Sequence, residues 1–356
     1  MKEGWRCSVK RIIQLIIIAV ALLLPMETTF AEESGFSVRP IMPKDQIDSV
    51  SYFHFPMTFN EKKTISVLIK NHQKTPTTVQ IDSANGFSNP FGNMNYTKEK
   101  QTEFSTFLNN KYRLAEFINY DKKITLKPLE EREIQLNIKL PEGVNEGQVL
   151  GGIQFQAYIN QNNTSSQEEN NSAAFGVKVK HRYTIGILIE LPKKVSSNLE
   201  VKKAAISTDT SVPQIQTEIW NTSPTITKGL SFKYQVFKKG SEKVLFEGTK
   251  DLFDFAPVTS MIVPVDWAYK SFQPGKYEVK IALLEKENQK IVKEKINEFK
   301  VEKTKVVQYA KKTGENNGVI PSPVLWSNWV YAILIILIIG IFYIGYRLGK
   351  SRNKKH

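Results

Sequence analysis

Apolar residues alternate with polar ones in short stretches along most of the chain. Residues 65–69, ISVLI, alternate in this way and end in a polar turn at 71–76. The same period of two returns at residues 134–138 and 277–283. This period is typical of antiparallel strands that bury one face. The chain is therefore expected to be all-β and to fold as two tandem immunoglobulin-like β-sandwich domains.

A polar stretch divides the patterned region into two halves. Residues 160–172, NQNNTSSQEENNS, contain no apolar side chain and cannot contribute to a core. This break predicts a first domain at 32–157 and a second at 176–303, with 158–175 as a polar linker. Because residues 183–189 resume the period of two, a hairpin loop between two strands is the alternative.

The N-terminus has the features of an export signal. Four basic residues precede an apolar run at residues 12–24, and Pro25 and the small residues Thr29 and Ala31 follow it. This order is typical of a secretory signal peptide, here residues 1–31. The apolar run is short for a membrane span, so an uncleaved N-terminal anchor is the weaker alternative.

An uncharged segment near the C-terminus is long enough to cross a bilayer once as a helix. It covers residues 326–346, with Trp326 and Trp329 at one border and Tyr346 at the other. Aromatic rings of this kind prefer the membrane interface. The segment is therefore predicted to be a transmembrane anchor.

Basic residues follow this segment and orient it. The tail at 347–356 begins with Arg347 and carries a net charge of +5. The positive-inside rule places such a tail in the cytoplasm. Residues 304–325 show no clear period and are expected to be a juxtamembrane spacer. The sequence thus predicts a single-pass type I membrane protein with both domains extracellular.

The net charge of +14 is distributed unevenly along the chain. Residues 36–157 hold 15 basic and 13 acidic residues, whereas residues 176–303 hold 22 and 15. Secretion argues against nucleic acid as a partner, although the sequence pI is about 9.5. The second domain is the basic one, and it would attract an anionic wall polymer or an acidic protein face. Lysines that keep the surface soluble and protect strand edges explain the same excess.

The sequence contains no recognisable catalytic or cofactor motif. Cys7 is the only cysteine, and the four histidines do not form H-x-x-H or H-E-x-x-H. G-x-S-x-G, the P-loop and G-x-G-x-x-G are also absent from the sequence. The chain is therefore expected not to be an enzyme and to need neither a cofactor nor a metal ion.

One segment of the first half combines aromatic and amide side chains. Phe87, Phe91 and Tyr96 lie among four asparagines, namely Asn85, Asn89, Asn93 and Asn95. Aromatic faces pack on sugar C–H groups, and amides hydrogen-bond to hydroxyls. The segment is a candidate glycan-binding loop. Rings that cover the sandwich core are the favoured alternative.

Several sequence motifs occur in an order that resembles the order in a known family. In the first half these motifs are FSVRPIMPKDQIDS, YFHF, KTISVLIKN, KPLEEREIQLNIKLPEG and GQVLGGIQF. In the second half they are YTIGILIE, PQIQTEIWNTSPT, YQVFKKGSEKVLFEG, FAPVTSMIVPVDW and PGKYEVKI. The first set is similar to the peptidoglycan-binding domain of the WxL-interacting proteins of Gram-positive bacteria, and the second set is similar to the host-binding domain of that family.

This resemblance implies a non-enzymatic surface adaptor that binds peptidoglycan and WxL-domain proteins and holds them at the cell wall. Its second domain would contact a host extracellular protein. Alternatives are a host adhesin that acts mainly through the second domain and an extracytoplasmic chaperone for surface proteins. The motif positions carried over are Gln46, Ile47, Asp48, Gly151, Gly152, Ile153, Asp266 and Trp267. The glycines are equally consistent with close strand approach, and Trp267 with a place in the core.

Overall fold

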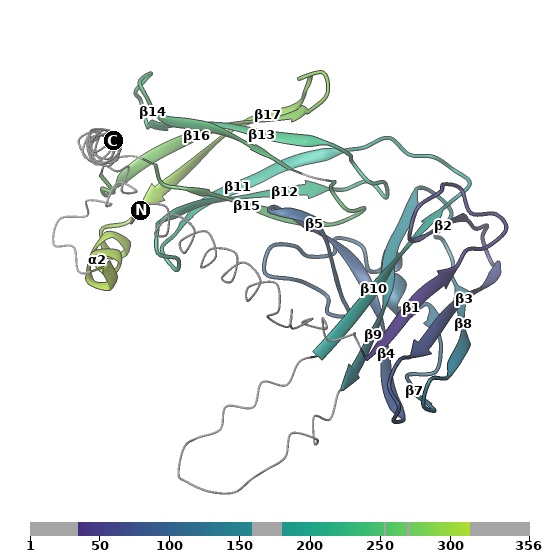
Figure 1. Ribbon diagram of the computed structural model, residues 1–356. Helices are drawn as coiled ribbons and strands as arrows, with labels where there is room; N and C mark the ends of the chain where they lie inside the picture. The colour runs from purple at the N-terminus through teal and green to yellow at the C-terminus, as the bar shows by residue number, and fades with distance from the viewer. Residues whose placement is uncertain (1–34, 159–179, 253, 269–270, 314–356) are drawn as a thin grey trace, which may run out of the picture.

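The computed structural model describes residues 35–158, 180–252, 254–268 and 271–313, which fold into two β-sandwiches (Figure 1). The predicted signal peptide, the 326–346 segment with Trp326, Trp329 and Tyr346, and the tail from Arg347 lie outside these ranges. Within them, no helix is both long and apolar enough to cross a membrane.

The first sandwich packs a four-stranded sheet, β1-β3-β8-β6, on a six-stranded sheet, β2-β10-β9-β4-β5, in which β7 also pairs with β4. All strand pairs are antiparallel except β2 with β10. Alternate residues of each strand fill one core between the sheets. The strands are β1 (Phe36–Ile41), β2 (Phe53–Pro56), β3 (Lys62–Asn71), β4 (Thr77–Asn89), β5 (Gly92–Thr97), β6 (Ile118–Asn119), β7 (Lys123–Leu126), β8 (Glu131–Lys139), β9 (Gln148–Tyr158) and β10 (Lys180–Glu190).

Of the two alternatives for residues 158–175, a linker and a hairpin loop, the strand pairing favours the hairpin. β9 and β10 pair along their full lengths, so the intervening residues 159–179 connect neighbouring strands of one sheet. β10 belongs to the first sandwich because Ile185 and Ile187 are buried in its core. The chain passes to the second sandwich only after Leu191. The polar stretch 160–172 itself lies outside the described residues.

The second sandwich packs the sheet β11-β12-β15 on the sheet β14-β13-β16-β17. Residues 214–221, which form β12, alternate strictly between partly exposed and buried positions. This alternation buries one face of the strand between the two sheets. The strands are β11 (Leu199–Ser207), β12 (Gln214–Asn221), β13 (Leu230–Lys238), β14 (Val244–Asp251), β15 (Ser260–Asp266), β16 (Gly275–Glu285) and β17 (Ile291–Val301).

A helix, α2 (Lys303–Thr313), stands where the sequence predicted the start of a patternless spacer. Tyr309 is its buried residue, and its ring meets the Phe272 ring edge-on at 5.8 Å. Lys305 Nζ donates to the Ile206 carbonyl oxygen at 2.7 Å. Few apolar residues face the core, so the helix has only a weak periodic signal.

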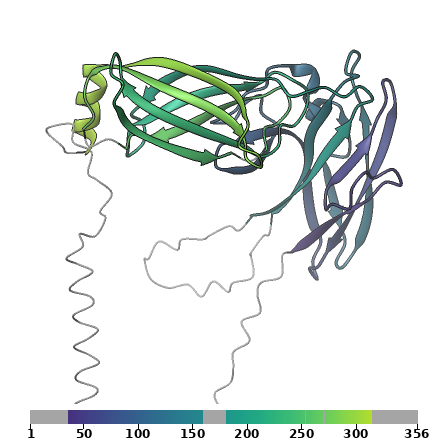
Figure 2. The same ribbon diagram turned by 90° about the horizontal axis from the view of Figure 1, so that it is seen from above.

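The two sandwiches meet at an elbow (Figure 2). Residues 104–107 of the first sandwich run along the free edge of β15, where Ser260 N–H donates to the Thr106 carbonyl oxygen at 2.8 Å and Ile262 N–H to that of Phe104 at 2.7 Å. Leu150 and Leu188 bury their side chains against Ala256 of the second sandwich. Main-chain pairing and apolar burial together connect the two halves.

Candidate functional site

The outer face of the six-stranded sheet carries a polar surface beside the elbow. Core-facing residues alternate with outward-facing ones on β4, β9 and β10, and the register aligns the outward residues in cross-strand rows. One row is Asp82, Gln154 and Thr184, and the next is Gln80, Gln156 and Arg182. We call these six residues, together with Tyr52 and Tyr96, the platform.

Two glycines make room for one of the platform's aromatic rings. Gly152 and Gly186 are direct neighbours in the register of β9 and β10. A Cβ atom on Gly152 would lie 3.1 Å from Tyr96 Cδ1, and one on Gly186 would lie 3.1 Å from the Tyr96 hydroxyl oxygen. The Tyr96 ring therefore lies over both glycines. Burial, with a smaller contribution from Tyr52, raises the pKa of Tyr96 to about 12 and keeps its hydroxyl neutral.

Gly151, the other glycine that the sequence analysis singled out, lies close to neighbouring residues of the first sandwich. A Cβ atom on Gly151 would lie 2.6 Å from the Ala84 carbonyl oxygen and 2.7 Å from Leu114 Cβ. Neither Gly151 nor Gly152 has room for a side chain, which agrees with the interpretation of close approach. Their contribution to a site is thus to shape it.

Polar groups of the platform are held by one another but remain accessible. Arg182 donates to Gln156 Oε1 through Nε at 3.1 Å and through Nη2 at 2.7 Å. Gln154 Nε2 donates to the Tyr96 carbonyl oxygen at 3.1 Å. Arg182 is exposed, and Tyr52 is 37% exposed. The surface offers hydrogen-bond donors and acceptors next to aromatic rings.

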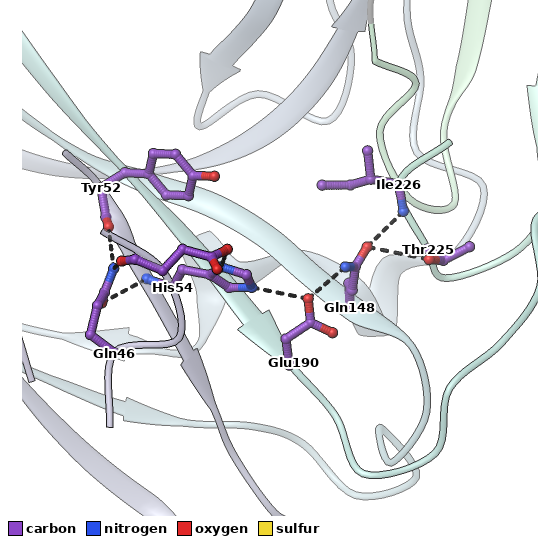
Figure 3. A network of polar contacts seen from close by, with 8 residues as sticks. Gln46, Tyr52, His54, Gln148, Glu190, Thr225 and Ile226 are labelled. Carbon is purple, nitrogen blue, oxygen red and sulfur yellow. Dashed lines mark hydrogen bonds and ion pairs between the residues drawn. The ribbon is translucent and has the colours of Figure 1, made fainter. Parts of the chain in front are cut away.

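Gln46 closes the free edge of β2 beside the platform. The His54 backbone N–H donates to Gln46 Oε1 at 3.0 Å, and Gln46 Nε2 donates to the Tyr52 carbonyl oxygen at 2.9 Å (Figure 3). Ile47 N–H donates to the His54 carbonyl oxygen at 2.8 Å. The amide of Gln46 thus replaces a neighbouring strand and protects the edge.

A chain of polar contacts runs from this edge to the second sandwich. His54 Nδ1 lies 2.9 Å from Asp48 Oδ2, and His54 Nε2 lies 3.0 Å from Glu190 Oε1. Gln148 Nε2 donates to the same Glu190 oxygen at 2.7 Å, and Gln148 Oε1 accepts from Ile226 N–H at 2.7 Å (Figure 3). We call these residues the His54 network.

The sequence pointed to Gln46 and Asp48 but not to His54, Glu190 and Gln148. The sequence did contain a signal for Gln148 and Glu190, because Gln148 lies in the motif GQVLGGIQF and Glu190 ends the motif YTIGILIE. Gln148 opens β9 and Glu190 ends β10, so the hairpin register places them opposite each other. Nothing in the sequence around His54 indicated its two carboxylate neighbours.

The predicted glycan-binding loop is a hairpin of β4 and β5, and its rings do not share one surface. Phe87 is fully buried, with its ring edge-on to Phe107 at 4.9 Å, as the alternative of core packing expected. Phe91 is exposed at the elbow, where Lys250 Nζ lies 5.0 Å from its ring centre. Only Tyr96 reaches the platform.

Of the positions carried over in the second half, Trp267 lies in the core. It is 2% exposed and its ring meets Tyr277 edge-on at 5.0 Å. Its indole N–H donates to the Ser271 carbonyl oxygen at 3.1 Å. Asp266 is exposed and accepts from Gln214 Nε2 at 2.8 Å. Neither residue lies in the first sandwich, which carries the platform.

Acidic and histidine side chains do not gather into a metal site in the part of the chain that the structure describes. The His54 network places Asp48 and Glu190 on opposite sides of one imidazole, bound to different ring nitrogens. This arrangement orients a side chain; it does not form a coordination shell.

Comparisons with solved structures show weak similarity to pilus chaperones. A chaperone–tip adhesin complex of the Csu pili of Acinetobacter baumannii shares 14% identity, with a TM-score of 0.33 and coverage of 75% of this chain and 98% of that chain. The E. coli chaperone DraB shares 12%, with a TM-score of 0.28 and coverage of 75% and 98%. Structural similarity at this level does not indicate a function. A search of curated proteins found no match.

Family models match both halves of the chain. Residues 36–157 match the peptidoglycan binding domain of the WxL Interacting Protein family, and residues 172–311 match its host binding domain. The two matches follow the order that the motifs predicted, and together they cover most of the chain. Both are binding domains, and neither match indicates a catalytic family. This chain belongs to the WxL Interacting Protein family.

Proposed function

We propose that this protein is a non-enzymatic surface adaptor that binds peptidoglycan through the platform of its first domain. The platform carries the proposal, because it combines aromatic and amide groups from the region that matches a peptidoglycan-binding domain with the exposed guanidinium group of Arg182 on the paired strand β10. Tyrosine rings pack on sugar C–H groups, and glutamine amides pair with hydroxyl and acetamido groups. Arg182 suits the carboxylates of a peptide stem.

The adaptor also holds WxL-domain proteins at the Gram-positive wall in this proposal. Apolar side chains support a protein partner, since Met42, Ile47, Tyr52 and Phe59 are all exposed in the segment around β2. Exposed apolar groups near a protected strand edge favour side-chain contacts over added main-chain pairing. The export signal, the single C-terminal span and the immunoglobulin-like character of both sandwiches belong to the same proposal.

Sedimentation of the full-length protein with purified peptidoglycan tests the wall-binding part. We expect Tyr52→Ala and Arg182→Ala each to lower the retained fraction severalfold. Matched controls are Phe59→Ala, an exposed ring outside the platform, and Gln135→Ala on the outer face of the other sheet. Retention that is unchanged in both platform variants would contradict the proposal.

Coprecipitation with a purified WxL-domain protein tests the second part. The expected result is a complex that survives washing and weakens when Ile47 is replaced by Ser. Rapidly released complexes would favour the chaperone alternative instead.

A second role is supported for the second domain, which matches a host-binding domain and has the larger basic excess. We propose that this domain faces a host ligand. Binding of the full-length protein to immobilised extracellular matrix tests this role, and loss of binding at raised ionic strength is expected for a basic surface.

A further inference from the structure

The second domain has an open pocket of about 440 Å³ where β11, β12 and β17 meet. β11 and β17 are edge strands of opposite sheets, and Lys295 of β17 bridges them by donating to the Val201 carbonyl oxygen at 2.8 Å. The residues that line the pocket are Lys202, Lys203, Glu218, Trp220, Lys295 and Asn297. A shift in register between Val201 and Ala204 bulges β11 at this point. Bulges of this kind re-aim side chains.

Positive charge gathers around an indole ring in this pocket. Lys202 Nζ lies 4.0 Å from the centre of the Trp220 ring and pairs with Glu200. Lys203 is exposed and has no ion-pair partner among the described residues. The Lys202 hydrogen bond lowers the pKa of Glu200, and Lys293 and Lys295 add to this effect. The local field therefore favours an anion.

Hydrogen-bonding groups of the pocket are prepared for a polar ligand. Trp220 Nε1 donates to Glu218 Oε1 at 2.8 Å and holds that carboxylate at the pocket. Asn297 is 8% exposed, and its Nδ2 has no acceptor among the described residues. A buried donor without an acceptor is costly, so an oxygen atom supplied by a ligand would stabilise it.

We infer that this pocket binds an acidic sugar unit of a polysaccharide. The sugar carboxylate faces Lys203 and Lys295, the ring packs against the exposed part of Trp220, and hydroxyls bond to Glu218 and Asn297. Neutral sugars would leave the lysines without a counter-charge. This inference deepens the host-facing role proposed for the second domain by naming its ligand class.

Calorimetric titration of the full-length protein tests the inference with three probes. A hyaluronan hexasaccharide represents a host polymer, purified teichuronic acid represents a wall polymer, and a chitin hexasaccharide is the neutral control. We expect at least one acidic probe to bind and the neutral probe to bind at least about tenfold more weakly. The acidic probe that binds more tightly identifies the source.

Variants connect this binding to the pocket. Trp220→Ala and Lys203→Glu are each expected to weaken the acidic probe about tenfold, while Lys233→Glu, an exposed lysine on β13, changes it less than about twofold. Lys203→Glu is a surface change, so it keeps the test valid if Trp220→Ala unfolds the domain. Absence of acidic binding, equal binding of the neutral probe, or unchanged affinity in Lys203→Glu overturns the inference. Peptidoglycan sedimentation of Lys203→Glu is expected to stay at the wild-type level. Binding of the full-length protein to immobilised extracellular matrix without binding of any acidic probe would overturn this inference and leave the host-facing role intact.

Discussion

His54 Nε2 lies 3.0 Å from Glu190 Oε1, although 136 residues separate the two in the sequence. The contact joins β2 to the end of β10, and Gln148 extends it to the second sandwich. A partly buried carboxylate that accepts from two neighbours stabilises both the edge of the first domain and the elbow. The contact therefore links the strand edge beside the platform to the polar groups at the elbow.

Glu190→Ala is expected to lower the free energy of unfolding by about 1–3 kcal/mol, because His54 Nε2 and Gln148 Nε2 both lose their acceptor in a partly buried place. Chemical denaturation measures the change. Glu298→Ala is the matched control, since its ion pair with Lys239 is exposed and should contribute less than about 1 kcal/mol. Equal effects of the two substitutions would contradict a structural role for the His54 network.

Val258→Ala is expected to destabilise the elbow. Val258 follows β14 in the chain, yet its side chain is 3% exposed in the core of the first sandwich. Its backbone φ of 44° is unusual for a β-branched residue, so surrounding contacts must hold it there. We expect a loss of about 1–3 kcal/mol and faster hydrogen exchange at Leu108, whose N–H donates to the Val258 carbonyl oxygen. Val292→Ala, at an exposed position of β17, should change neither the free energy of unfolding nor the hydrogen exchange of Leu108.

Gly152→Ala is expected to displace the Tyr96 ring from the platform. The new Cβ would lie 2.8 Å from the Ile185 carbonyl oxygen, which is main chain and cannot move freely. A cost of about 1–3 kcal/mol is expected from this overpacking, and peptidoglycan retention should fall with it. Gly275→Ala is the control, because its nearest neighbour would lie at an ordinary 3.4 Å. Wild-type stability of Gly152→Ala would show that the close approach is not tight.

Stability is expected to fall as the pH rises from about 10 to about 12, through Tyr96. Its phenol ionises near 10.0 in the unfolded chain but only near 12 in the folded protein, because burial disfavours the charged form. Below this window both states keep the proton; within it only the folded state does, so unfolding becomes more favourable as pH rises. The full contribution is about 2–3 kcal/mol. Tyr96→Phe should lack this part of the pH dependence in denaturation curves. Identical curves for the two proteins would contradict it.

Local signals in the sequence were enough for the strands and for the class of fold. The alternation at residues 65–69 and 277–283 appears as β3 and β16, because one buried face imposes a period of two on any such strand. The polar stretch at 160–172 was ambiguous, since a solvated loop and a linker need the same composition. Helix α2 had too few core-facing residues to be recognised.

Candidate residues were harder to interpret, because their roles depend on neighbours far away in the chain. Gln46 was singled out without a role, and its role became clear only with the free edge of β2 beside it. Phe87, Phe91 and Tyr96 looked like one set in sequence, but strand alternation and the elbow send them to three different environments.

The sequence by itself determined the all-β class, the two patterned halves and the family, since each depends on composition, period or motif order along the chain. Only the tertiary structure decided that β10 completes the first sheet, that residues 104–107 pair with β15, and that His54 meets Glu190. These features depend on which strand edges and buried polar groups come together. That outcome is set by the burial of apolar surface and the pairing of backbone groups across the whole fold, and no local stretch encodes it.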